Sequence, residues 1–308
     1  MSGSTGAGPV PARPGFAIIA LWLGVLAVST GAIFARMADA PALVIATGRM
    51  VIASLVLLPL IGLRHRTAIR GLSVRHLALA GVAGTFLALH FATWISSLSY
   101  TSIANSVLLV NTVPVWVALA GPLVGLDRLD RRGWIAVTLA FAGAAVVSAP
   151  SVSLEGDGLL GNLLAVAGAV AMAAYLLCGR ALRARLDLVP YIMLAYGVAA
   201  IILLLATLAA GLPLLGHGTA TYLALVAMAL IPQLIGHSTY NWSLKALPAT
   251  AVSISLLGEA VFASLWGWLF FAEGLPPSTL AGGALVLAGI VLAQTSLDRT
   301  RHAGAGQA

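Results

Sequence analysis

Charged residues are scarce in this sequence, and cysteine is nearly absent. Only 8% of the 308 residues are Asp, Glu, Lys or Arg, and 60% are apolar. A typical soluble domain is about 25% charged, so the composition excludes a soluble globular protein and predicts an all-α integral membrane protein. The one cysteine, Cys178, excludes an intramolecular disulfide and a thiolate metal cage.

Motifs for nucleotide binding, metal binding and catalysis are also missing. The sequence contains no phosphate-binding loop, no HExxH, no Cys/His metal cluster and no GxSxG. We therefore expect no catalytic residues, no metal or cofactor and no step driven by ATP. An intramembrane enzyme that uses His90 or His237 as a base is the alternative, but neither histidine lies beside a nucleophile motif.

Long apolar runs fill the chain instead. A helix needs about 20 apolar residues to cross the hydrocarbon core, and ten segments are long enough. Short linkers with Pro, Gly and charged residues separate them. The predicted spans are 16–35, 41–63, 76–98, 100–124, 133–150, 158–179, 188–211, 219–242, 248–271 and 276–296. By composition, residues 1–15 are a disordered tail, and residues 297–308 form a C-terminal tail.

The basic residues indicate how these spans are oriented. With the N-terminus inside, 14 of the 16 Arg and Lys residues fall on one side of the membrane, whereas only Arg36 falls outside and Arg49 lies within a span. This asymmetry predicts a multi-pass protein of the plasma (inner) membrane with both termini in the cytoplasm. It also accounts for the net charge of +7 without a nucleic-acid partner, so lipid and a small molecule are the expected partners.

Two parts of the chain align with each other without a gap. Residues 97–148 fall on 243–294, at an offset of 146. The alignment places Ser97-Leu98 on Ser243-Leu244, Ala142-Gly143 on Ala288-Gly289, and acidic Asp127 on acidic Glu273. We expect two five-helix repeats, 16–150 and 158–296, which must be inverted in the membrane because five is odd. Inverted repeats are typical of secondary transporters with a site near the midplane, and a duplication kept only for packing is the alternative.

Several motifs occur in an order typical of one transporter family. They are Trp22-x-Gly24 in the first span, Arg49 in the second, Pro114-Val115-Trp116 in the fourth, an acid in the next loop, and a glycine-rich fifth span. Over about residues 16–296 the chain resembles the EamA type of the drug/metabolite transporter superfamily and, more loosely, its exporters of aromatic and neutral amino acids. The resemblance implies an exporter or exchanger of small metabolites. Glu259-Ala260-Val261 departs from the family's frequent Glu-Pro-Val, so a bend there would depend on Gly258.

Two formal charges, Arg49 and Glu259, lie inside predicted spans. A charge at the bilayer centre costs about 2.5–3.5 kcal/mol on insertion scales, so each must face a cavity or a partner. Arg49 lies about 12 Å and Glu259 about 18 Å from the outer ends of their spans, a difference that an arginine can bridge directly or through water. The pair is either a clamp between the halves or a site in which Arg49 meets a substrate carboxylate and Glu259 takes part in proton coupling. Both interpretations hold if the pair forms in only one conformational state.

Four more residues are predicted to line the same cavity. They are His90 and Trp94, which share one face of the third span, Asn111, and Gln233. A cavity with a cation, a carboxylate, amides and an aromatic wall suits a zwitterion, so amino acids are the first candidate substrates. A sugar, a nucleoside or a cationic drug is the alternative, as is a passive pore. Structural roles in packing for His90 and in helix-to-helix hydrogen bonding for Asn111 also fit the sequence.

The eighth and neighbouring spans contribute a candidate gate and candidate hinges. Gln233, His237 and Tyr240 share a helix face that runs towards the cytoplasm, where His237 and Tyr240 are the gate residues. A place in an interfacial aromatic belt is the alternative for Tyr240. The hinge residues are Pro114, Pro232 and Gly258, of which the prolines interrupt helices near mid-membrane. No oligomer is required for this site.

Overall fold

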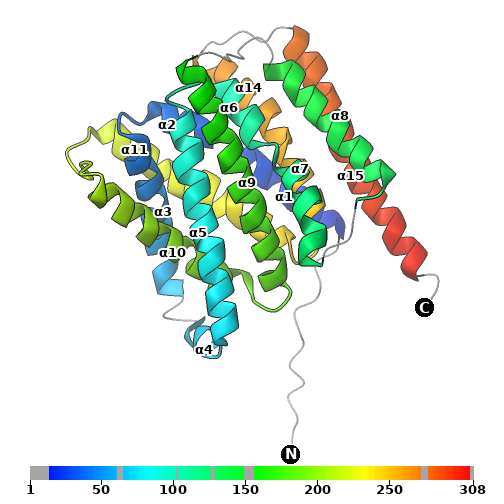
Figure 1. The fold of residues 1–308 in the computed structure, drawn as a ribbon, viewed down its shortest axis with the longest axis horizontal. Coiled ribbons are helices and arrows are strands. Elements are labelled where there is room, and N and C mark those ends of the chain that lie inside the picture. Colours follow the sequence, from blue (N-terminus) through cyan, green and yellow to red (C-terminus); the bar gives the residue numbers. More distant parts are fainter. Residues whose placement is uncertain are drawn as a thin grey trace, which may run out of the picture.

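The computed structural model describes residues 14–60, 65–101, 103–125, 129–148, 156–271 and 277–305, in which all regular elements are helices (Figure 1). They are α1 (Pro14–Val28), α2 (Gly31–Met37), α3 (Ala42–Leu60), α4 (Arg66–Arg70), α5 (Val74–Ser97), α6 (Ile103–Val110), α7 (Val113–Ala120), the 3-10 helix η2 (Gly121–Val124), α8 (Arg131–Ser148), α9 (Asp157–Arg183), α10 (Leu188–Ala209), α11 (Thr219–Met228), the π-helix η4 (Ala229–His237), α12 (Ser238–Ser243), α13 (Ala249–Leu256), α14 (Gly258–Phe271) and α15 (Pro277–Ala305). Residues 1–13 of the predicted N-terminal tail lie outside the described residues, and in the predicted C-terminal tail α15 continues to Ala305.

Eight helical stretches within the described residues are long and apolar enough to cross a membrane. They are Phe16–Met37, Ala42–Leu60, Val74–Ser97, Asn105–Val124, Asp157–Arg183, Leu188–Ala209, Thr219–Ser243 and Ala249–Phe270. The fifth and tenth predicted spans correspond to α8 and α15, which are not among these eight, although α15 contains the shorter apolar stretch Leu280–Ala293. The protein is therefore a multi-pass helical membrane protein, and the count of ten spans stays a prediction.

The bounds of the helices repeat at the offset seen in the sequence. Adding 146 to the bounds of α6, Ile103–Val110, gives those of α13, Ala249–Leu256. The same shift carries the first residue of α3, Ala42, onto the first residue of α10, Leu188. It also carries the last residue of α5, Ser97, onto the last residue of α12, Ser243. The repeat is thus visible in the backbone, beyond the segment that aligns by residue type.

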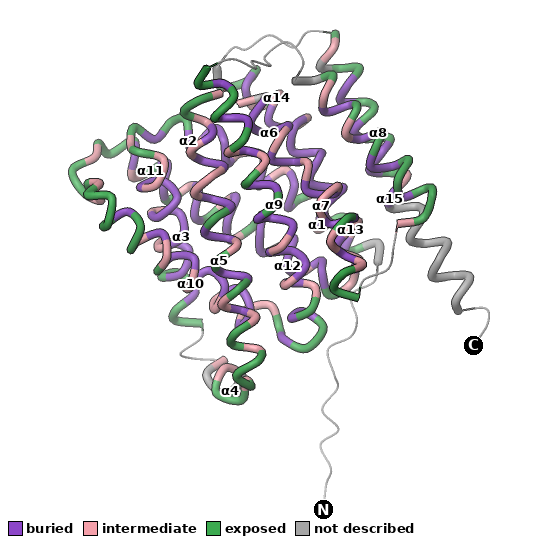
Figure 2. The backbone as a smooth tube through the Cα atoms, viewed as in Figure 1, coloured by how far each residue is buried: buried purple, intermediate pink, exposed green. Residues whose placement is uncertain are grey.

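Equivalent helices of the two halves pack against each other. α3 packs on α10, and α8 packs on α15 at one edge of the molecule (Figure 1). The α8–α15 contact is close. A Cβ atom on Gly143 would lie only 2.5 Å from the Gly282 carbonyl oxygen, and one on Gly289 only 2.7 Å from the Ala140 nitrogen. Small residues of this kind let helix backbones approach in a membrane. Buried residues gather where the helices face one another, and exposed residues lie on the outer faces (Figure 2).

Several of the long apolar stretches are broken in their middle. α6 ends at Val110 and α7 starts at Val113, with Pro114 in its first turn, where a proline needs no backbone partner. The equivalent break separates α13 from α14 at Leu257. α1 and α2 are separated at Ser29 and Thr30, whose hydroxyls donate to backbone carbonyls one turn earlier. Irregular backbone at this depth is tolerated only where protein or a cavity covers it.

Candidate functional site

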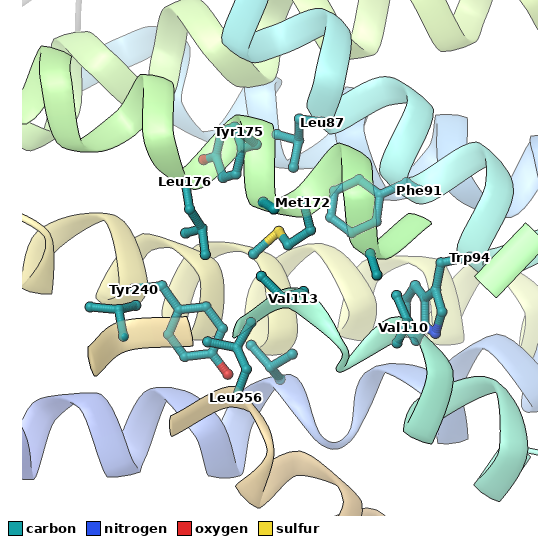
Figure 3. Packing of buried hydrophobic residues seen from close by; sticks show 14 of the residues in the cluster. Leu87, Phe91, Trp94, Val110, Val113, Met172, Tyr175, Leu176, Tyr240 and Leu256 are labelled. Carbon is teal, nitrogen blue, oxygen red and sulfur yellow. The ribbon is translucent and has the colours of Figure 1, made fainter. Parts of the chain in front are cut away.

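A small cavity lies where these breaks meet, inside the packed core that Figure 3 shows. It contains about 20 Å³ of space open to the centre of a water-sized sphere, which is enough for a water but not for a solute of several heavy atoms. Its lining residues are Val28, His90, Trp94, Val110, Asn111, Val113, Met172, His237, Tyr240, Leu256 and Glu259. They come from both repeats, so the cavity belongs to the interface between the halves.

Glu259 and Asn111 join the two central breaks. Glu259 is 4% exposed and lies in the first turn of α14, where the N-terminal end of the helix favours a negative charge. Asn111 lies directly after α6, and its Nδ2 donates to Glu259 Oε2 over 3.2 Å. The bond crosses from one repeat to the other. A carboxylate is therefore held at the cavity wall by a neutral partner.

His90 and Trp94 form an aromatic wall of the cavity. Their rings stack with centroids 6.0 Å apart and planes 6° from parallel. His90 Nδ1 lies 2.9 Å from the Gly168 carbonyl oxygen. Because a carbonyl only accepts, Nδ1 carries the proton of the neutral ring, and Nε2 is left as an acceptor. The indole N–H of Trp94 is buried without a protein partner.

His237 and Tyr240, the predicted gate residues, lie in the same wall as the predicted cavity residues. His237 packs against Phe91, with ring centroids 5.2 Å apart and a T-shaped geometry, and its Nδ1 has no protein partner. Tyr240 is fully buried, its ring lies 5.7 Å from that of His237, and its hydroxyl has no protein partner. This burial places Tyr240 in the interior and not in an aromatic belt.

Arg49 and Gln233 lie beside the cavity and not on its wall. Arg49 is fully buried in α3, its Nε donates to Gln233 Oε1 over 2.8 Å, and its guanidinium carbon sits 4.0 Å above the centre of the Phe91 ring. Arg49 and Glu259 are both described, and no Arg49 nitrogen comes within 4.0 Å of a Glu259 carboxylate oxygen. The two interior charges are thus each held by a neutral amide in this structure.

The three predicted hinge residues all lie at irregular backbone. Pro114 begins α7 after the first central break, and Gly258 begins α14 after the second. Pro232 lies inside the π-helix η4, which also carries Gln233 and His237. π-helical segments are frequent at functional sites.

Two residues near the site were missed from the sequence. Phe91 stands under the Arg49 guanidinium, and its place directly after His90 in an apolar span was the only signal. Gly31 begins α2, where a Cβ atom would lie 3.3 Å from Trp94 Cη2 and 3.7 Å from Arg49 Nη1. Gly31 lies inside the one continuous span predicted at 16–35, so neither the break nor the side chains that meet there were expected.

Metal binding finds no support in the described residues. Over these ranges, no three His, Cys, Asp or Glu side chains gather as a metal ion would require. The polar groups at the cavity are instead arranged as hydrogen-bond donors and acceptors that can meet a small polar solute.

Comparison with known proteins identifies the family to which these features correspond. The sequence profile of the EamA-like transporter family matches residues 15–149 and, a second time, residues 159–295. The pseudopaline exporter CntI of Pseudomonas aeruginosa is 27% identical over 252 residues, which cover 79% of this chain and 82% of CntI. The uncharacterized transporter YwfM of Bacillus subtilis is 25% identical over 240 residues, covering 74% and 76%. An uncharacterized transporter of Archaeoglobus fulgidus is 24% identical over 219 residues, covering 70% and 75%.

Solved structures contain the same fold. One crystal structure aligns with a TM-score of 0.75 and 19% sequence identity. The alignment covers 93% of this chain and 99% of the chain in that crystal structure. A likeness at this identity supports the fold alone. The relatives in sequence are all named as transporters or exporters, and none of them as an enzyme.

Proposed function

Because the chain belongs to the EamA-like transporter family, we propose that it exports a small zwitterionic solute, with amino acids as the first class, by alternating access. The observation that carries this proposal is the cavity at the break points of α6–α7 and α13–α14, a largely apolar site into which Asn111, Glu259 and two histidines bring polar groups. Broken helices at the interface of two repeats are where secondary transporters hold their substrates. The wall combines the Glu259 carboxylate with aromatic rings and neutral acceptors, which suits an amine with an apolar side chain.

In the proposed topology, α8 and α15 are the fifth and tenth spans. Two five-helix repeats, residues 16–150 and 158–296, then have opposite orientations in the inner membrane, with both termini in the cytoplasm. The match of helix bounds at an offset of 146 supports this arrangement, as does the distribution of basic residues. The close α8–α15 pair would hold the repeats together away from the site.

Transport requires the cavity to enlarge towards one side at a time. At its present size it holds no more than a water, so the structure corresponds to a state without room for the solute. At Asn111–Thr112, at Leu257 and in the π-helix η4, the backbone departs from the regular α-helical pattern of hydrogen bonds. We therefore assign the hinges to Pro114, Pro232 and Gly258, and the inner gate to His237 and Tyr240, with His90, Trp94, Asn111 and Glu259 on the cavity wall.

Counterflow in proteoliposomes tests the proposal. Vesicles are loaded with an unlabelled amino acid, and uptake of the same labelled compound is followed at equal pH on both sides, with protein-free vesicles as the control. We expect saturable, transient accumulation for several amino acids. Chromatography of the recovered label should show an unchanged compound, which separates a carrier from an enzyme. Well-folded protein that exchanges none of them would contradict the amino-acid class, and linear flux without counterflow would indicate a pore.

A cationic solute is the second candidate, and one observation favours it. The cavity wall has a carboxylate and four aromatic or imidazole rings, His90, Trp94, His237 and Tyr240, whereas the cationic Arg49 does not line it. Aromatic faces and a carboxylate attract ammonium groups. Counterflow of a labelled quaternary ammonium compound, in the absence of any amino-acid exchange, would support this candidate over the first.

A further inference from the structure

The interior has a second group of polar atoms outside the cavity wall, around Arg49. The Arg49 side chain is fully buried, and its Nε is satisfied by Gln233. Its Nη2 meets no protein acceptor, and neither does Gln233 Nε2. Gln233 is also fully buried. Two hydrogen-bond donors on two linked side chains therefore lack a protein acceptor in hydrogen-bonding geometry, although the Tyr196 side chain lies beside Gln233.

Buried donors without an acceptor destabilise the folded protein unless a ligand supplies the acceptor. A buried hydrogen-bonding group without a partner costs about 1–3 kcal/mol, and more when the group is charged. No Asp or Glu oxygen in the described residues lies within 4.0 Å of an Arg49 nitrogen, and the guanidinium instead contacts the Phe91 ring and Gln233 Oε1. Stacking on an aromatic face contributes about 0.5–2 kcal/mol, which offsets only part of the cost. An anion beside Arg49 Nη2 would supply the acceptor that the protein does not.

We propose that Arg49 and Gln233 form a carboxylate subsite that determines which solutes the protein carries. The inference rests on the proposed function and deepens it, because it requires each substrate to bear a carboxylate. A carboxylate has two oxygens in a plane, and a guanidinium with a neighbouring amide offers two donors to match them. Glu259, at the cavity wall of the other repeat, then receives the amine of the same solute.

The subsite lies close to the cavity. Gly31 lies between the two regions, since a Cβ atom there would be 3.3 Å from Trp94 Cη2, 3.6 Å from Pro232 Cβ and 3.7 Å from Arg49 Nη1. Trp94 lines the cavity, and its indole N–H is a third buried donor without a protein partner. In the proposed transport cycle, enlargement of the cavity beside Trp94 and Gly31 would bring a solute to Arg49.

Competition with three related compounds tests the subsite. Counterflow of labelled L-phenylalanine is measured against unlabelled L-phenylalanine, L-phenylalaninamide, which lacks the carboxylate, and 3-phenylpropionate, which lacks the amine. In the wild type we expect the amide to compete at least about tenfold more weakly than the amino acid, since a charge-assisted pair of hydrogen bonds is lost. In Arg49→Lys and Gln233→Met this preference should shrink to about twofold or less. Thr47→Val is the control, because it removes the buried Thr47–Thr207 hydrogen bond from the same helix and should keep the preference.

A binding measurement keeps the test independent of transport. In detergent, 3-phenylpropionate should raise the Tm of the wild type and of Thr47→Val but not that of Gln233→Met. Two results would overturn the subsite without contradicting the carrier function. One is equal competition by L-phenylalanine and L-phenylalaninamide in the wild type, and the other is a preference for L-phenylalanine that survives in both site variants. If both variants weaken competition by L-phenylalanine and by L-phenylalaninamide to the same extent, Arg49 is a clamp and the subsite is wrong. Absence of all amino-acid exchange contradicts the proposed function instead, and an unchanged Tm with 3-phenylpropionate then overturns the subsite as well.

Discussion

At the scale of single residues, each of the two charged side chains in the interior is hydrogen-bonded to a side-chain amide and not to the other charge. Asn111 holds Glu259 and Gln233 holds Arg49, and each bond joins helices far apart in the sequence. An ion pair between buried charges would be hard to open, because separating it leaves both charges uncompensated. Neutral partners avoid this penalty. The same charges therefore remain available to a solute with a charge of each sign.

Glu259→Gln separates the charge of this side chain from its packing. Glutamine keeps an oxygen that accepts from Asn111, so we expect the Tm to stay within a few degrees of the wild type. Exchange of an amine-bearing solute should fall at least about tenfold, as a hydrogen bond to a charged group is worth about 1.5–3 kcal/mol. If Glu259 carries the coupled proton, acidifying the outer medium should speed efflux in the wild type and not in the variant.

The control for Glu259→Gln is Asp187→Asn, which removes an exposed carboxylate that pairs with Lys245 outside the cavity. It should transport at the wild-type rate because surface ion pairs contribute little. Full transport by Glu259→Gln would contradict the role given to this carboxylate.

At the scale of helices, irregular backbone is concentrated at the site and regular helix surrounds it. The breaks after α6 and α13 are equivalent positions of the two repeats, whereas the π-helix η4 has no counterpart in α5, its equivalent in the first repeat. η4 packs against α1 and α3, so it touches both the α1–α2 break and the helix that carries Arg49. This asymmetry makes the second repeat the one with the more deformable span.

Pro232→Ala tests whether the π-helix is needed for transport. Alanine restores the backbone N–H that proline lacks, so we expect a regular α-helix to become more favourable and the Tm to rise by a few degrees. Conversion of the π-helix to an α-helix changes the number of residues per turn, so Gln233 should move relative to Arg49. We expect exchange to fall at least about fivefold. Both effects are read from thermal unfolding in detergent and from counterflow.

Pro190→Ala is the matched control, because Pro190 lies in the first turn of α10, where backbone N–H groups have no helical partner. It should change neither the Tm nor exchange by much. Wild-type exchange by Pro232→Ala would show that the bend serves packing alone.

The α8–α15 contact should carry stability and not selectivity. A methyl group added at Gly143 meets the backbone of α15 at 2.5 Å, so Gly143→Ala must push the helices apart and should cost about 1–3 kcal/mol. At Gly283 the nearest atom would lie 3.5 Å away, so Gly283→Ala should be tolerated. Thermal unfolding of the two variants side by side measures the difference. A Gly143→Ala variant as stable as Gly283→Ala would contradict the close packing of this pair.

At the scale of the whole molecule, much of the fold could be predicted because the bilayer sets the length of its elements. The span predicted at 188–211 is α10, Leu188–Ala209, and the resemblance to the EamA type is confirmed by the match of both halves to that family. The partners of the charges could not be predicted. The depths of Arg49 and Glu259 suggested a pair, direct or through water, but depth does not specify the direction a side chain takes around its helix. The Arg49–Gln233 bond joins residues 184 positions apart, and only the packing of α3 on η4 brings them together.

The central claim is that one cavity between the repeats opens to each side of the membrane in turn. Val110 lines this cavity at the end of α6 and is 4% exposed. With the single native cysteine removed by Cys178→Ala, Val110→Cys provides one thiol that can be labelled with a membrane-impermeant maleimide in right-side-out and in inside-out vesicles. We predict labelling from both sides, slowed on both by a transported solute. Labelling from one side only, unaffected by any solute that exchanges, would contradict alternating access.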